Sequence, residues 1–63
     1  MDGQTFRELR LKLAYSQAEL AREIGVSANT VARWERGELP VNRPAARVLE
    51  LLLLLRKRRK KVS

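Results

Sequence analysis

Apolar residues recur along most of the chain at the spacing of amphipathic helices. Phe6, Leu9 and Leu13 fall at positions i, i+3 and i+7, so they share one face of a helix expected over about residues 3–14. No stretch of useful length alternates apolar and polar residues with the two-residue period of a strand. The pattern therefore predicts an all-α fold of four helices, or of five.

Residues that start and stop helices divide the next part of the chain into two short helices. Ser16 and Glu19 have the spacing of a capping box, in which each side chain satisfies a backbone N–H at the start of a helix. Gly25 is expected to end that helix, because glycine adopts the left-handed conformation without a Cβ clash. Ser27 then offers an N-cap for a helix that runs to about Arg36. Two short helices joined by a tight turn indicate a helix-turn-helix unit.

The apolar residues of these two helices lie where the helices would meet. Leu20, Ala21 and Ile24 share the inner side of the first helix, and Val31 and Trp34 share the inner side of the second. A side chain larger than alanine at position 21 would push the crossing helices apart. The spacing of Trp34 from Val31 predicts a core residue rather than an aromatic that stacks on a base.

A longer helix is expected after the segment GELPVNRP, whose composition is typical of a loop. Asn42 can cap this helix, and Pro44 fits its first turn, where a missing N–H costs nothing. The helix continues through Leu51–Leu55 toward the basic run Arg56–Lys61. Five consecutive helical residues sweep about 400° around the axis, so these leucines cannot all face one core.

Composition excludes several classes of function. The chain has 63 residues, enough for one domain, and contains neither cysteine nor histidine. Disulfides, zinc sites of the usual Cys/His kind and nucleophile–imidazole catalysis are therefore ruled out. We expect no catalytic residue, no metal site, no cofactor and no small-molecule substrate, and an enzyme is the least favoured class.

Net charge narrows the class of partner. The chain carries 14 Lys and Arg against 7 Asp and Glu, a formal net charge of +7. Such an excess in a short chain indicates nucleic acid or an anionic membrane surface. The longest apolar run, Leu51–Leu55, is far shorter than the roughly 20 residues of a membrane span. With no signal sequence at the N-terminus, we expect a cytoplasmic protein without a membrane partner.

The segment Ser16 to Glu38 reads SQAELAREIGVSANTVARWERGE. It closely resembles the repressor and Cro family of phages and bacteria, also called the xenobiotic-response-element-like helix-turn-helix family, and the resemblance extends over roughly residues 4–55. It implies a compact helical domain whose third helix lies in the major groove of double-stranded DNA. It also implies a sequence-specific transcriptional regulator, with repression the expected direction.

The resemblance assigns roles to eight positions of the expected helix-turn-helix and its surroundings. Base contacts are expected from Ala28, Asn29, Thr30 and Arg33, and contacts to the DNA backbone from Gln17, Ser27, Arg36 and Arg43. Arginine can pair bidentately with guanine and asparagine with adenine, so Arg33 and Asn29 are the main candidates for direct readout. Thr30 has a phosphate contact as its alternative, and Arg43 has a contact in the minor groove.

Two further positions match a structural feature of the family. An arginine of the first helix commonly pairs there with an acidic residue near the end of the third, and Arg10 and Glu35 occupy these places. The resemblance therefore implies a partly buried ion pair that braces the third helix. Removing one partner should be more harmful than removing both, because it leaves an unpaired charge.

The leucine-rich helix indicates a protein interface. If Val48, Leu51, Leu52 and Leu55 face the domain, then three apolar side chains are left outside: Leu49, Leu53 and Leu54. Such a patch is unusual on a monomer, so we expect a homodimer or a different protein partner. The alternative function is accordingly an antitoxin or accessory subunit that binds a partner through this helix and DNA for autoregulation.

The basic run Arg56–Lys61 has two interpretations. A block of like charges is usually disordered and solvated, but a flexible arm can also add phosphate contacts on bound DNA. Both interpretations stay open at this point. The expected organisation is one domain over residues 1–55, followed by a flexible basic tail over residues 56–63.

Overall fold

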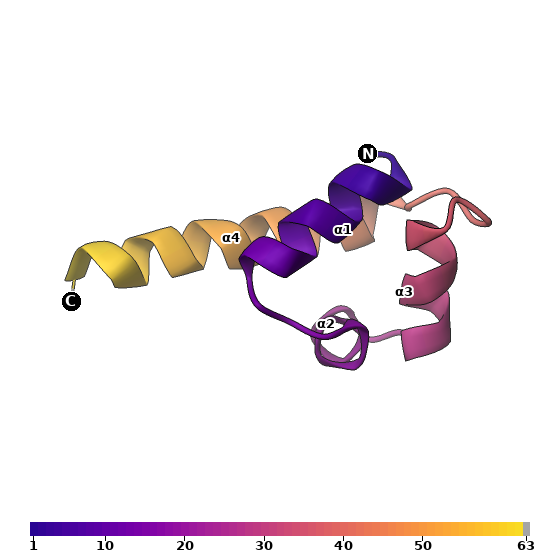
Figure 1. The fold of residues 1–63 in the computed structure, drawn as a ribbon. Coiled ribbons are helices and arrows are strands. Elements are labelled where there is room, and N and C mark those ends of the chain that lie inside the picture. Colours follow the sequence, from indigo (N-terminus) through magenta and orange to yellow (C-terminus); the bar gives the residue numbers. More distant parts are fainter. Residues whose placement is uncertain (63) are drawn as a thin grey trace.

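The computed structural model describes the backbone of residues 1–62 and the side chains of residues 1–56. It contains four helices, α1 (Gly3–Lys12), α2 (Gln17–Ile24), α3 (Ala28–Glu35) and α4 (Arg43–Val62), as Figure 1 shows. The expected all-α fold is confirmed, with four helices and no strand in the described residues. The expected basic tail has nearly all of its side chains outside those residues and stays a prediction.

Each helix begins at a polar side chain that accepts a hydrogen bond from a backbone N–H three residues further on. These N-caps are Asp2, Ser16, Ser27 and Asn42. The capping box at Ser16 and Glu19 is complete, since both side chains accept a backbone N–H of the other residue. The caps at positions 16, 27 and 42 are those expected from the sequence, which supports the division of the chain into these helices.

The turn between α2 and α3 depends on glycine. Gly25 ends α2 with a φ of 91°, in the left-handed region that other residues avoid. The N–H groups of Gly25 and Val26 both donate to the carbonyl oxygen of Ala21, at 2.8 and 3.0 Å. Only residues 25–27 then separate the two helices, so the expected helix-turn-helix is present.

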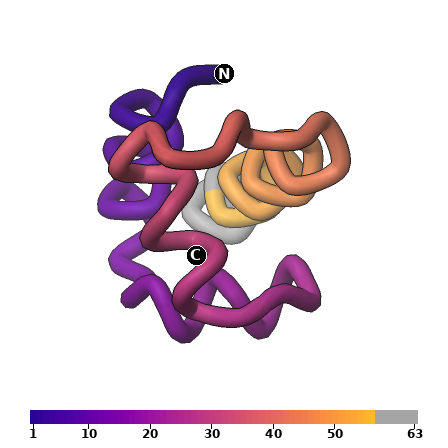
Figure 2. The backbone as a smooth tube through the Cα atoms, turned by 90° about the vertical axis from the view of Figure 1, so that its right-hand side faces the viewer, coloured from indigo at the N-terminus to yellow at the C-terminus, as the bar shows by residue number. Residues whose placement is uncertain are grey.

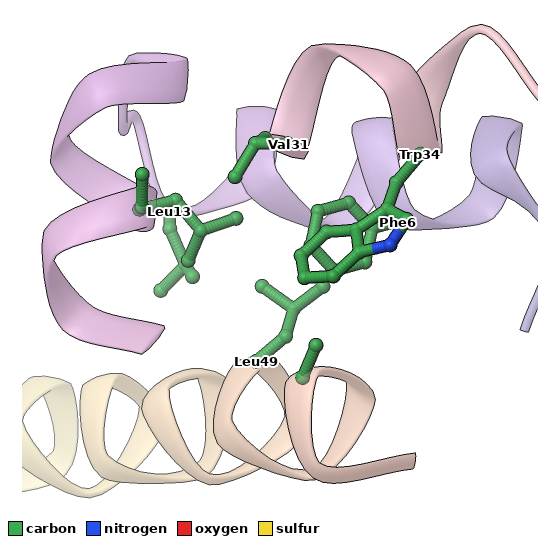
Figure 3. Packing of buried hydrophobic residues seen from close by; sticks show 8 residues of the cluster. Phe6, Leu13, Val31, Trp34 and Leu49 are labelled. Atoms are coloured by element: carbon green, nitrogen blue, oxygen red, sulfur yellow. The ribbon is translucent and has the colours of Figure 1, made fainter. Parts of the chain in front are cut away.

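The hydrophobic core lies where all four helices meet. Its eight buried members, several of which are drawn in Figure 3, are Phe6, Leu13, Leu20, Ala21, Val31, Trp34, Ala45 and Leu49. Trp34 packs edge-on against Phe6, with ring centroids 5.5 Å apart and an interplanar angle of 67°. This contact ties α3 to α1, and the expected core role of Trp34 is confirmed.

The first half of α4 completes the core. Figure 2 views the molecule nearly along this helix and shows the other three helices lying beside and below it. In Figure 3 the side chain of Leu49 points from α4 toward Phe6 and Trp34. Leu49 is fully buried, so the expectation that it belongs to an outer interface is wrong. Leu53 packs partly against the core as well, whereas Leu54 is exposed as expected.

The observed inner face of α4 is offset from the expected one by about one residue. The buried positions are Ala45 and Leu49, with Leu52 and Leu53 half-buried behind them. Leu51 and Leu55, which were expected to face the domain, are exposed. A one-residue offset turns a helix by about 100°. Ala45 and Leu49 are four residues apart and both fully buried, so they mark the inner face of α4.

One non-glycine residue shares the left-handed conformation. Ala14, which follows α1, has a φ of 60°, and its N–H donates to the carbonyl oxygen of Leu11 at 2.9 Å. No feature of the sequence indicated this conformation. The loop from α1 to α2 therefore contains a strained residue where glycine would fit better.

We expect opposite effects from two exchanges at these turns. Gly25→Ala should lower the free energy of unfolding by about 1 kcal/mol, because a Cβ is unfavourable in the left-handed region. Ala14→Gly should give a small gain, since the relief of strain exceeds the added freedom of the unfolded chain. Urea unfolding followed by circular dichroism measures both. Equal stability of Gly25→Ala and the parent protein would contradict the assigned turn.

Candidate nucleic-acid interface

The outer face of α3 presents the residues that the sequence assigned to base contacts. Ala28 and Asn29 are exposed at its first turn, and Arg33 is half-exposed one turn later. Asn29 and Arg33 are four residues apart, so their side chains lie on the same side of the helix. The opposite side carries Val31 and Trp34, which are buried in the core. α3 therefore has an anchored inner face and a polar outer face, and it stands at one edge of the molecule (Figure 1).

Two hydroxyl groups lie together at the start of α3. The Oγ atom of Ser27 accepts the N–H of Thr30 at 3.2 Å, and the two side-chain oxygens are 3.0 Å apart. Because only one hydroxyl can donate to the other, the second proton can go to an outside acceptor such as a phosphate oxygen. Thr30 is half-buried, so it is less open to a ligand than Ala28 and Asn29.

Gln17, the first residue of α2, is held by the end of α3. Its Nε2 atom donates to Oε1 of Glu35 at 3.1 Å. The sequence assigned Gln17 to a phosphate contact but gave no sign of this link between the two helices. The link fixes the amide group at the start of α2, and the second N–H of that amide can still donate to a phosphate.

Arg10 and Glu35 form the ion pair that the resemblance implied. The Nε atom of Arg10 lies 2.6 Å from Oε2 of Glu35, and its Nη2 atom donates to Oε1 at 3.0 Å. The third branch of the guanidinium, Nη1, donates to the carbonyl oxygen of Tyr15 at 2.8 Å. The two side chains are only 9% and 4% exposed. A buried pair with this bidentate geometry fixes α3 relative to α1 and to the loop before α2.

The environment of Glu35 keeps this residue charged. Burial alone would raise the pKa of its carboxyl group, but hydrogen bonds from Arg10 and Gln17 and the charges of Arg10 and Arg7 hold the pKa below its ordinary value. All three groups favour the carboxylate form. The carboxyl group of Glu35, at the end of α3, is therefore ionised at neutral pH.

Glu38 lies against both arginines of the outer face, a contact that the sequence did not reveal. Its Oε2 atom accepts the Nε–H of Arg36 at 2.7 Å, and its Oε1 atom is 3.5 Å from Nε of Arg33. The side chains of Arg33 and Arg36 are 43% and 55% exposed, so both arginines remain open to a ligand. The only sequence signal for the contact was an acidic residue directly after Gly37.

Within the described residues, Arg43 makes no hydrogen bond or ion pair with another position assigned to a DNA contact. It is exposed at the first position of α4, at the end of the loop that follows α3 (Figure 1).

Among the described residues no helix has the length and apolar character needed to cross a bilayer. These residues also contain no group of three or more acidic side chains placed to hold a metal ion.

The ion pair generates a stability prediction. Glu35→Leu should lower the free energy of unfolding by about 3 kcal/mol, because it leaves the guanidinium of Arg10 buried and unpaired. The double exchange Arg10→Met with Glu35→Leu should recover most of that loss. Urea unfolding at neutral pH is measured for the parent protein, for Glu35→Leu and Arg10→Met alone, and for the double variant. A double variant as unstable as the sum of the two single variants would show that the pair is not coupled.

Comparison with known proteins identifies the family of this segment. The profile of the helix-turn-helix family matches residues 6–54. A protein of Pyrococcus furiosus named "Putative HTH-type transcriptional regulatory protein" is 53% identical over 38 residues, 60% of this chain and 12% of its own length. A protein of the same description from Thermococcus kodakarensis is 44% identical over 50 residues, 79% of this chain and 16% of its own length.

The chain thus spans less than a fifth of these two relatives, at 12% and 16% of their lengths. No solved structure matches it. The matched family segment includes the whole of α2 and α3 and the core residues from Phe6 to Leu49. The protein belongs to the Cro/C1-type helix-turn-helix family.

Proposed function

We propose that the protein is a sequence-specific DNA-binding transcriptional regulator that inserts α3 into the major groove. The observation that carries this proposal is the pair Asn29 and Arg33, which share the open side of a helix whose other side is buried. An α-helix fits the major groove, and these two side chains can pair with adenine and guanine edges respectively. The family membership and the names of the two relatives support a role in transcription.

Contacts to the DNA backbone would orient α3, the helix proposed to read the bases. Gln17 at the start of α2 and the hydroxyls of Ser27 and Thr30 offer hydrogen-bond donors to phosphate oxygens on one side. Arg36 and Arg43 offer positive charge on the other side, after the end of α3. Such contacts carry no sequence information, but they supply much of the affinity and make it depend on salt concentration. Repression is the simpler outcome, because it requires only that the operator be occupied.

The exposed side of α4 would join two copies. Leu51, Leu54 and Leu55 are 43%, 54% and 55% exposed and lie on the outer side of this helix. We infer that they pack against the same residues of a second copy. A two-fold dimer would place two reading helices about 34 Å apart in successive major grooves of a near-palindromic site. A different protein on the same leucines is the alternative, and it would correspond to an antitoxin or accessory subunit.

Arg33→Ala tests the reading role of α3. The variant should lose at least about fivefold in its preference for a selected operator over random duplex, because a bidentate arginine–guanine contact is removed. Selection from random duplexes supplies the operator, and mobility-shift titrations measure both affinities.

Lys12→Ala is the matched control for Arg33→Ala, because it removes the same charge from the exposed end of α1. It should weaken binding to both duplexes by a similar small factor. An Arg33→Ala protein that also loses the same factor on both duplexes would place Arg33 at the phosphates and remove it from base readout.

Leu54→Glu tests the role of α4. The exchange places a charge in the exposed patch without touching the core, so the variant should stay folded and become monomeric. Sedimentation equilibrium measures the association, and binding to a full operator should weaken more than binding to a half-site. A parent protein that is monomeric at high micromolar concentration would contradict the homodimer.

A further inference from the structure

We propose that Glu38 is a specificity-determining residue, which holds Arg33 in its reading position and lowers binding to DNA of unselected sequence. This inference rests on the proposed function, since it assigns the role through Arg33. Glu38 itself is placed at the rim of the outer face of α3, and it carries the opposite charge to the two arginines beside it.

The backbone turn after α3 determines where Glu38 lies. Gly37 has a φ of 79°, and its N–H donates to the carbonyl oxygen of Trp34 at 3.1 Å. The N–H of Glu38 donates back to the carbonyl oxygen of Arg33 at 2.9 Å. These two bonds make a Schellman motif, which returns the chain over the last turn of the helix. Glu38 is therefore held beside Arg33 by the main chain as well as by its side chain.

The side-chain contact in this motif is unusual in being ionic. Schellman motifs often bring two apolar side chains together at these positions, but here the positions carry Arg33 and Glu38. The carboxylate is fixed by Arg36, whose Nε and Nη2 atoms lie 2.7 and 3.4 Å from its two oxygens. Its Oε1 atom then faces Nε of Arg33 at 3.5 Å. Arg36 thus positions Glu38, and Glu38 positions Arg33.

The contact with Glu38 leaves the end of Arg33 that would bind a base available. Glu38 faces the Nε edge of the guanidinium, whereas O6 and N7 of guanine are bound by the far end, which carries Nη1 and Nη2. A guanidinium held at one edge loses less conformational freedom when it binds with the other. Glu38 therefore favours the base contact over the many other positions that a free arginine could take at nearby phosphates.

The charge of Glu38 acts in the same direction. The hydrogen bond from Arg36, together with the charges of Arg36 and Arg33, holds the pKa of the Glu38 carboxyl below its ordinary value. The carboxylate is therefore present at neutral pH and offsets part of the positive charge on this face. Binding to unselected DNA depends on that charge, so it is reduced more than binding to the operator.

The test compares Glu38→Gln with Glu8→Gln, which removes the same charge from the exposed side of α1. Mobility-shift titrations with the selected operator and with a scrambled duplex give a ratio of affinities for each protein. For Glu38→Gln this ratio should fall roughly three- to fivefold, the upper part of the range open to a solvent-exposed ion pair. Most of the fall should come from tighter binding to the scrambled duplex. For Glu8→Gln the ratio should stay at the parent value.

A double variant shows whether Glu38 acts through Arg33. In an Arg33→Ala background, Glu38→Gln should tighten binding to both duplexes by a similar factor, because a negative charge is removed. It should leave the ratio unchanged, because the side chain that Glu38 positions is gone. Circular dichroism checks that Glu38→Gln melts like the parent protein, as expected for an exposed side chain outside the core.

Two results would overturn the role of Glu38. One is a Glu38→Gln protein with the same ratio as Glu8→Gln, and the other is a fall in the ratio on Glu38→Gln that persists without Arg33. A parent protein that prefers no duplex would remove the proposed function as well. The role of Glu38 alone would be removed by a different result. In that result the parent protein clearly prefers the operator, Arg33→Ala abolishes the preference, and Glu38→Gln leaves it intact.

Discussion

The bidentate pair of Arg10 and Glu35 is the interaction on which the arrangement of the helices depends. Its hydrogen bonds reach α1, α3, the carbonyl of Tyr15 before α2 and the amide of Gln17 at the start of α2. Charges removed from water are tolerated only when all their partners are in place. A chain of 63 residues buries a small core, and apolar contacts of that extent allow small rotations of a helix. The ion pair has one geometry, so it selects one orientation of α3.

The orientation of α3 determines which of its residues are exposed. Trp34 and Glu35 are neighbours near the end of α3, and one packs on Phe6 while the other pairs with Arg10. Their positions determine which side of the helix is open, and Asn29 and Arg33 occupy that side. Gln17 also donates to the carboxylate of Glu35, and it thereby links the ion pair to the first turn of α2. Residues with no access to a ligand therefore set the geometry of the residues that would contact one.

Local rules predicted the helix boundaries well, because each boundary is encoded by one or two residues close in sequence. Ser16, Ser27 and Asn42 cap helices as expected, and Gly25 forms the turn. The orientation of α4 was not predictable in this way, since a run of leucines offers several equally apolar faces and the true one is selected by contacts with α1 and α2. The left-handed Ala14 and the contact of Glu38 with two arginines likewise depend on how the chain folds back, which sequence spacing does not state.

The position of Trp34 has a practical consequence. It is the only tryptophan of the chain, and it is 3% exposed on the inner side of α3. Its fluorescence emission therefore reports the packing of α3 against α1, without a contribution from a second indole. Because the ring points away from the outer face, bound DNA bases cannot stack on it and quench it directly. The protein thus contains an optical probe of its own folding that is shielded from the surface assigned to the ligand.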